Sequence, residues 1–150
     1  LQLANYVATL VSGGEHYAAH LLKSVKSYDN SRLIYNYGEE PVNDMNISDS
    51  TMAAVTKGMH DLTHDSLTSA FSRCMVEAGA KTGSAQVGTD IANGVFVAYA
   101  PYDDPEIAVA IVVEKGGSGS LLANAAVDII NAWFSRGSSS VTTGENTLLQ

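Results

Sequence analysis

Four consecutive residues, Lys81, Thr82, Gly83 and Ser84, form the part of this sequence that is best suited to chemistry. Together they offer an ammonium group, two hydroxyls and a glycine that lets another backbone or a ligand lie close along the chain. Such a strip suits an acyl substrate that carries a carboxylate. Short motifs such as Lys-Thr-Gly also occur by chance, so on these residues alone an exposed edge strand without a ligand is the simpler interpretation.

A second candidate is a pair of histidines, His60 and His64, which are four residues apart and flanked by Asp61 and Asp65. This spacing places two imidazoles on one face of a helix, where they could bind a metal ion. Nothing in the sequence indicates a third ligand, and such pairs usually mark a solvated helix end. We therefore predict no metal site and no cofactor.

The remaining reactive side chains favour structural roles. Cys74 is the only cysteine, so no disulfide can form within the chain, and this residue is typical of a small core side chain. Residues 115–120 superficially resemble a phosphate-binding loop, but the lysine precedes the glycines, and a flexible strand-to-helix turn is the simpler interpretation. The other candidates are predicted to be surface histidines or aromatic residues of the core and its rim: His16, His20, Tyr99, Tyr102 and Trp133.

Composition argues against two classes of protein. Sixteen acidic and eight basic residues give a net charge of −8, without any cluster of lysine and arginine. The counterion release that drives nucleic-acid binding therefore has little to act on, and we predict no nucleic-acid partner. No apolar run is long enough to span a membrane. The length of 150 residues and the hydrophobic content of 45% fit one globular domain.

The elements that must position the strip follow from the hydrophobic periodicity. The first half of the chain is predicted to contain a helix of about a dozen residues from Leu1, a β-hairpin over residues 20–37 and a second helix capped within residues 48–50. Residues 63–79 show no clear pattern. The apolar stripe of the second helix is interpreted as core and consists of Met52, Val55, Met59 and Leu62.

Three strand-like segments follow, over residues 80–87, 94–100 and 107–114, and the strip lies on the first of them. The last two are apolar on both faces, and the short turn between them predicts an antiparallel hairpin that is covered on both sides. The predicted fold class is α+β, an antiparallel β-meander packed with helices. One cover is a long amphipathic helix with the apolar residues Leu122, Ala125, Ala126, Ile129, Ile130 and Trp133.

Three stretches follow one another along the chain: AKTGSAQ, then NGVFVAYAPYDDPEIAVAIVVEKGGSG, then a helix ending DIINAWF. Together they resemble the closing part of the transpeptidase domain of class B penicillin-binding proteins, of which Lys-Thr-Gly is one motif. The opening LQLANYVATLVSGGEHY is similar to the helix of that family which follows a Thr-Pro shortly after the middle motif. The resemblance implies that residues 1–136 are the C-terminal portion of such a domain, and residues 137–150 are predicted to be a flexible tail.

The resemblance implies a DD-transpeptidase that cross-links peptidoglycan stem peptides through a serine acyl-enzyme and is acylated by β-lactams. In this family the Lys-Thr-Gly strand borders the active-site cleft. Lys81 would then steer the substrate carboxylate, Thr82 would hydrogen-bond it, and Gly83 would let the acyl chain lie along the strand edge. The backbone N–H of Ser84 would be one of two oxyanion-hole donors. Two positions depart from the family pattern, since Ser84 is commonly Thr and Ala80 is often Gly.

The printed sequence contains neither a Ser-x-x-Lys nor a Ser-x-Asn. Without a nucleophile and its base, an acyl-transfer site keeps at most its binding and oxyanion contributions, so we expect the isolated chain to be inactive. The resemblance implies that the absent motifs lie N-terminal to Leu1, on elements that pack against the other face of the sheet. The isolated chain is therefore expected to self-associate through an exposed apolar face. The resemblance also implies a parent protein with an N-terminal membrane anchor and a catalytic domain outside the cytoplasmic membrane.

Two classes of function stay open. The chain is either part of a penicillin-binding transpeptidase, or a non-catalytic binding module that keeps the fold and the strip. The coding sequence upstream of Leu1 discriminates between them, because only the enzyme requires Ser-x-x-Lys and Ser-x-Asn there.

Overall fold

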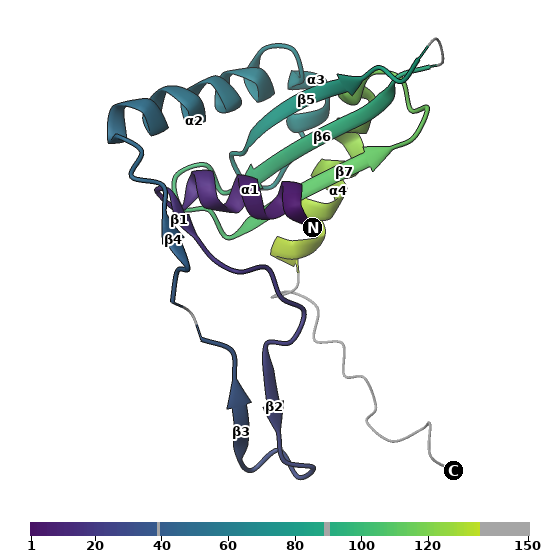
Figure 1. Cartoon of the computed structure of the whole chain (residues 1–150). Coiled ribbons are helices and arrows are strands. Elements are labelled where there is room, and N and C mark those ends of the chain that lie inside the picture. The colour runs from purple at the N-terminus through teal and green to yellow at the C-terminus, as the bar shows by residue number, and fades with distance from the viewer. Residues whose placement is uncertain (39, 89–90, 136–150) are drawn as a thin grey trace, which may run out of the picture.

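The computed structural model describes residues 1–38, 40–88 and 91–135, so the tail predicted for residues 137–150 lies outside the described part. Helices lie on both sides of a central sheet, as Figure 1 shows. Of the helices that the structure describes, none is long and apolar enough to cross a membrane. The predicted α+β meander with helical covers is confirmed. The sheet is antiparallel, has β6 in the middle, and consists of β5 (Gly79–Ala85), β6 (Asn93–Ala100) and β7 (Ile107–Val113).

One face of the sheet packs against α1 (Gln2–Val11) and α2 (Asp49–His64). A small core forms there between the helices and β6, and its buried members are Val7, Met59, Val97 and Tyr99. The second helix begins where the sequence predicts. The Ser48 hydroxyl accepts a hydrogen bond from the Thr51 N–H at 3.3 Å and so caps the first turn.

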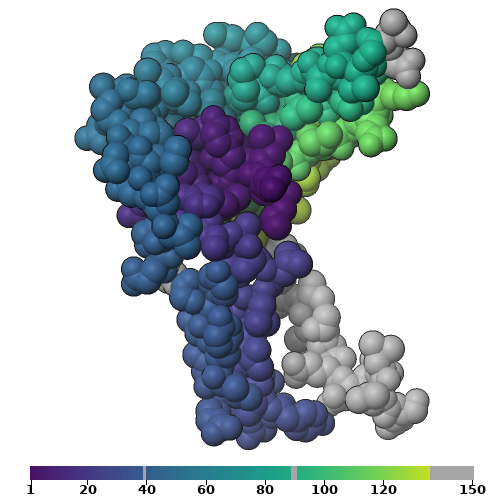
Figure 2. Space-filling model, viewed as in Figure 1, coloured from purple at the N-terminus to yellow at the C-terminus, as the bar shows by residue number. Residues whose placement is uncertain are grey.

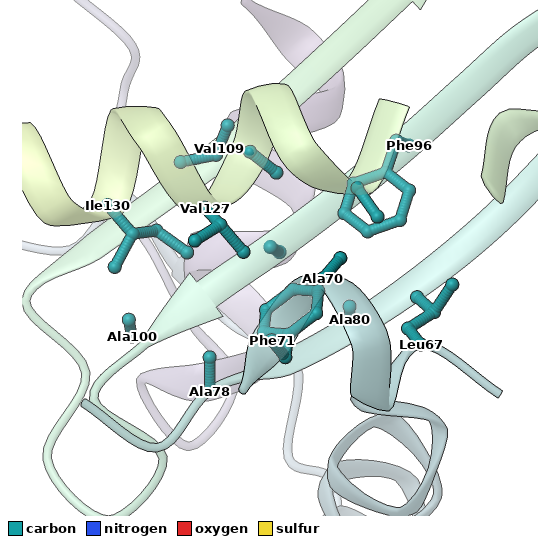
Figure 3. Packing of buried hydrophobic residues seen from close by; sticks show 13 residues of the cluster. Leu67, Ala70, Phe71, Ala78, Ala80, Phe96, Ala100, Val109, Val127 and Ile130 are labelled. Atoms are coloured by element: carbon teal, nitrogen blue, oxygen red, sulfur yellow. The ribbon is translucent and has the colours of Figure 1, made fainter. Parts of the chain in front are cut away.

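The opposite face packs against α3 (Thr68–Phe71), the 3-10 helix η1 (Gly119–Leu122) and α4 (Ala123–Phe134). Figure 3 shows this larger core, in which Phe71 of α3 and Ile130 of α4 approach the sheet. Neighbouring residues of a strand point to opposite faces. Phe96 therefore lies in this core, whereas its neighbour Val97 lies in the other. Two covered faces explain why β6 lacks charged and strongly polar side chains from Gly94 to Ala100.

The predicted apolar stripe of α2 is only partly buried. Met59 is buried, Met52 and Leu62 are half-buried, and Val55 is 38% exposed. The reason is that Val55 lies along an open groove between α1 and α2. Treating the whole stripe as core was therefore wrong for Val55.

The last helix buries only part of the predicted face, in which Ala126 and Ile130 are buried as expected. The residues of α4 that are buried are Ala123, Ala126, Val127 and Ile130. Three residues of the predicted stripe are exposed instead: Ala125, Ile129 and Trp133. Apolar residues on several sides of this helix left its rotation open in the sequence. The rotation is set by contacts with the segment after α3, where the Asn131 amide donates to the Arg73 carbonyl at 3.0 Å.

Two small sheets lie outside the central sheet: one contacts α1, and the other forms an arm that stands away from the body. The hairpin of β2 (Ser24–Lys26) and β3 (Leu33–Asn36) confirms the one predicted, and β1 (Glu15–His16) pairs with β4 (Asn43–Asp44). Figures 1 and 2 show the hairpin standing away from the helices and the central sheet. Asp29 holds the hairpin turn. Its carboxylate accepts hydrogen bonds from the hydroxyls of Ser27 and Ser31, which lower the pKa of Asp29 to about 2.

Candidate functional site

The strip of residues 81–84 lies on β5, at one edge of the central sheet. Among the strands that the structure describes, β5 pairs with β6 alone, so its other side has no strand beside it. The pairing places Lys81 opposite Val97 and Ser84 opposite Gly94. The predicted edge position of the strip is therefore confirmed.

Lys81 is exposed and borders the groove between α1 and α2. This groove has a volume of about 390 Å³, and its apolar walls include Tyr6, Leu10 and Val55. The Lys81 Nζ donates a hydrogen bond to the Thr82 carbonyl oxygen at 2.8 Å. No carboxylate of the described residues lies within ion-pair distance of this ammonium. Its charge is therefore available to an anionic ligand.

The 3-10 helix η1 supports the strip from one face of the sheet. The Gly119 N–H donates to the Ser84 Oγ at 3.4 Å. Gly119 also lies so close to β5 and β6 that a Cβ at this position would overlap the carbonyl oxygens of Gly83 and Val95. Only glycine permits this approach. The backbone of the strip is thus held by close packing on one face, while Ser84 stays exposed and Thr82 half-exposed.

The two departures from the pattern of the resembled family fit the strand. Ala80 is completely buried in the core that Figure 3 shows, so its methyl group fills space there. At Ser84, the hydroxyl that serine and threonine share makes the contact with Gly119. Both residues are therefore accommodated in the strand as it lies.

The other sequence candidates lie apart from the strip. His20 is exposed, as predicted, and stacks on Tyr37 with ring centroids 3.5 Å apart. His16 is half-buried instead of exposed, because its Nδ1 lies 3.1 Å from the Thr9 Oγ1. Cys74 is half-buried against the larger core, close to its predicted role. Of the aromatic residues predicted for the core or its rim, Tyr99 is fully buried. Tyr102 is half-buried and Trp133 is exposed.

One group of side chains was not predicted as a group. His60 and His64 lie side by side on α2, with ring centroids 4.1 Å apart. Glu77 reaches both from the segment before β5, and its Oε2 is 3.1 Å from the His60 Nε2 and 3.0 Å from the His64 Nε2. The sequence shows the histidine pair, but residues 63–79 have no periodicity that would bring Glu77 back to α2. A third potential metal ligand is therefore present that only the fold reveals.

Comparison with known proteins identifies the family. The family model of the penicillin-binding protein transpeptidase domain matches residues 1–131. Penicillin-binding protein 2B of Streptococcus pneumoniae serotype 2 is 34% identical over 151 residues, a match that covers 89% of this chain and 22% of that protein. Penicillin-binding protein 2A of Bacillus subtilis is 30% identical over 128 residues, which cover 75% of this chain and 18% of that protein.

Solved structures share the fold. Penicillin-binding protein 2B from S. pneumoniae strain R6 has a TM-score of 0.74 at 32% identity, over 88% of this chain and 24% of that chain. The imipenem acyl-enzyme complex of penicillin-binding protein A from M. tuberculosis has a TM-score of 0.71 at 27% identity, over 87% of this chain and 29% of that chain. The chain spans about a fifth of the length of these curated relatives. With the family model matched over residues 1–131 and the fold shared, the chain belongs to the penicillin-binding protein transpeptidase family, as one of its class B members.

Proposed function

We propose that this chain is the part of a peptidoglycan DD-transpeptidase that carries the substrate-facing strand of the active site. The whole enzyme cross-links cell-wall stem peptides through a serine acyl-enzyme, and sequence N-terminal to Leu1 supplies the serine nucleophile and its lysine. The observation that carries the proposal is the position of residues 81–84 on the open edge of β5, in a chain of this family.

Lys81 is proposed to steer the substrate carboxylate. Its ammonium is exposed and unpaired with any described carboxylate, and it stands beside apolar walls. Low-dielectric walls strengthen the attraction between an ammonium and a carboxylate relative to bulk water. Thr82 is the next residue on the strand, and its hydroxyl would donate to the same carboxylate.

The backbone N–H of Ser84 is proposed as an oxyanion donor. This role requires the N–H to point away from β6, toward the open side of the strand. The hydrogen bond from Lys81 Nζ to the Thr82 carbonyl supports that direction, because backbone groups two residues apart on an antiparallel strand point to the same side. A donor of this kind contributes about 3 kcal/mol to lowering the barrier for acyl transfer.

The same strand is proposed to receive β-lactams. Imipenem forms an acyl-enzyme with the M. tuberculosis penicillin-binding protein A, whose fold this chain shares. A β-lactam presents a reactive acyl carbonyl and a carboxylate, which are the two groups that the proposed roles of Ser84 and Lys81 address. We also propose that the intact protein is anchored at the cell membrane with this domain on the extracytoplasmic side, where peptidoglycan is cross-linked.

The missing part of the domain is proposed to cover the groove between α1 and α2. This groove is apolar, and Tyr6 at its edge is 59% exposed. Without its cover the isolated chain would bury this surface by self-association. Light scattering coupled to size exclusion tests this point, and a monomer at high protein concentration would contradict it.

The proposed function is tested by acylation kinetics in the longer protein, with its upstream sequence present. Lys81→Met should lower the second-order rate constant for acylation by a fluorescent penicillin about 10- to 100-fold, the equivalent of one charge-assisted hydrogen bond. Lys26→Met on the β2 strand is the matched control and should leave the rate unchanged. An unchanged rate in the Lys81 variant would remove Lys81 from the site.

A further inference from the structure

His60, His64 and Glu77 converge between α2 and the segment that leads into β5. Two ring nitrogens meet the same carboxylate oxygen, at 3.1 Å from His60 and 3.0 Å from His64. The candidate ligand atoms of the three residues all lie within 4.8 Å of one another. His60 is about three-quarters buried, whereas His64 and Glu77 are more exposed, so the group is open to solvent on one side.

Two of the three separations are close to those of ligands around one small cation. Zinc binds imidazole nitrogen and carboxylate oxygen at about 2.0–2.2 Å, which places the ligand atoms of a tetrahedron about 3.3 Å apart. The two distances to the Glu77 oxygen differ from this value by only a few tenths of an ångström. Two histidines and one glutamate are also a ligand set that zinc uses when its fourth position is open.

The hydrogen bonds of His64 prepare its Nε2 to be a ligand. The Thr63 hydroxyl has one hydrogen, for which the His60 carbonyl at 2.7 Å and the Ala78 carbonyl at 3.0 Å are both acceptors, so its oxygen can accept from the His64 Nδ1 at 3.1 Å. The His60 carbonyl oxygen, 3.2 Å from the same nitrogen, is also an acceptor. The Nδ1 of His64 therefore carries the proton, as in histidines that bind metals through Nε2.

With this tautomer, the Nε2 of His64 and the Glu77 oxygen need a positively charged group between them. With its Nδ1 donating, the His64 ring presents its Nε2 to the Glu77 carboxylate oxygen, 3.0 Å away. Two lone pairs at this distance repel each other unless a cation lies between them. A metal ion bound to both atoms would relieve this repulsion.

The group is also held in place before any ligand arrives. The Thr63 side chain is buried and donates to the Ala78 carbonyl at 3.0 Å, which fixes α2 to the segment next to Glu77. The Glu77 carbonyl accepts from the Tyr102 N–H at 2.9 Å. The Tyr102 ring packs on the His60 ring with centroids 4.2 Å apart. The side chains are thus presented by two anchored elements, which lowers the ordering cost of binding.

Local charge favours a cation over an anion. The nearest basic side chain on the same helix, Lys57, already pairs with Asp61 at 2.5 Å. The chain as a whole has a net charge of −8.

We propose that His60, His64 and Glu77 bind one Zn²⁺ ion, with the fourth coordination position open to solvent. The ion links the C-terminal half of α2 to the segment that leads into β5. It therefore acts as a structural clamp between the helix and the strand that carries residues 81–84, and it takes no part in acyl transfer.

Titration of Zn²⁺ into the metal-free chain, produced without a histidine tag, tests the proposal. Calorimetry should find one site per chain, and Glu77→Gln and His64→Asn should each weaken binding by more than tenfold. The loss of a direct ligand costs at least as much as the roughly 10- to 100-fold effect of a supporting residue. His20→Gln is the matched control, because His20 is an exposed histidine on the arm, and it should bind as the unchanged protein does.

A second measurement needs no variant and so holds even where a variant fails to fold. Diethyl pyrocarbonate modifies accessible histidines, and mass spectrometry of the peptides reports each of the four separately. Zn²⁺ should protect His60 and His64 and leave the modification of His16 and His20 unchanged. Absence of a stoichiometric site, equal protection of all four histidines, or binding that persists in both ligand variants would overturn the proposal. In that case the three side chains form only a hydrogen-bonded group.

Discussion

Gly79 is the residue of β5 with the least room for change. A Cβ at this position would overlap the ring of Tyr99, which is itself fully buried. Gly79→Ala should therefore lower the free energy of unfolding by about 1–3 kcal/mol, as overpacking of a core does. Urea denaturation measures this change in the free energy of unfolding.

Gly58 is the matched control for that substitution, because no atom lies within 4 Å of the position that its Cβ would take. It sits in the middle of α2, where alanine favours the helix by roughly 0.5–1 kcal/mol. Gly58→Ala should raise stability. Equal effects of the two substitutions would mean that the Gly79 environment is looser than described.

Tyr99 carries a buried hydroxyl that has no hydrogen-bond partner among the described residues. Removing an unpaired buried polar group costs nothing and can help, so Tyr99→Phe should be at least as stable as the unchanged chain at neutral pH. Burial is the main cause that raises the pKa of Tyr99 above its ordinary value of 10.0.

The raised pKa of Tyr99 predicts a pH dependence with a defined sign. The buried neutral phenol contributes its full share of stability below pH 10.0, and that share is lost as the pH rises through the folded-state pKa. Urea denaturation between neutral pH and pH 10.5 should therefore show that stability falls more steeply in the unchanged chain than in Tyr99→Phe. Parallel curves would contradict this burial of the hydroxyl.

At the scale of elements, Asn131 fastens α4 to the segment after α3. Its Oδ1 accepts from the Met75 N–H at 2.8 Å and its Nδ2 donates to the Arg73 carbonyl at 3.0 Å. Asn131→Ala leaves both backbone groups without these partners and should cost about 1–3 kcal/mol of stability in thermal or urea unfolding. Asp128→Asn is the control. It removes only the solvent-exposed pair with Arg73 and should have the smaller effect.

The strands could be predicted from the sequence more closely than the helix faces. A strand such as β6 has only two faces, and a run that is apolar at every position must be covered on both. The face of α4 was less certain, because Ile129 and Ile130 are adjacent and the sequence does not say which of them is covered. The answer depends on Asn131 and its contacts with residues 56 and 58 positions earlier in the chain.

At the scale of the whole molecule, the two candidate sites differ in how far apart their residues lie in the sequence. Residues 81–84 are contiguous, so their types and the stretches around them indicated both the strand and the family. The group around Glu77 depends on a return of the chain to α2, and its distances come from tertiary contacts at Thr63 and Tyr102. No local sequence pattern predicts that Glu77 lies beside the histidines of α2. Hydrophobic periodicity also describes single elements, so it could not show that the groove between α1 and α2 stays open.

The most direct test of the account is whether this polypeptide forms a covalent adduct with a penicillin. Intact-mass spectrometry after incubation with a fluorescent penicillin should show no adduct on the 150-residue chain. A longer form that begins further upstream should gain one penicilloyl group, on a serine N-terminal to Leu1. An adduct on the 150-residue chain itself, or none on the longer form, would contradict the claim that residues 81–84 serve a nucleophile supplied from upstream.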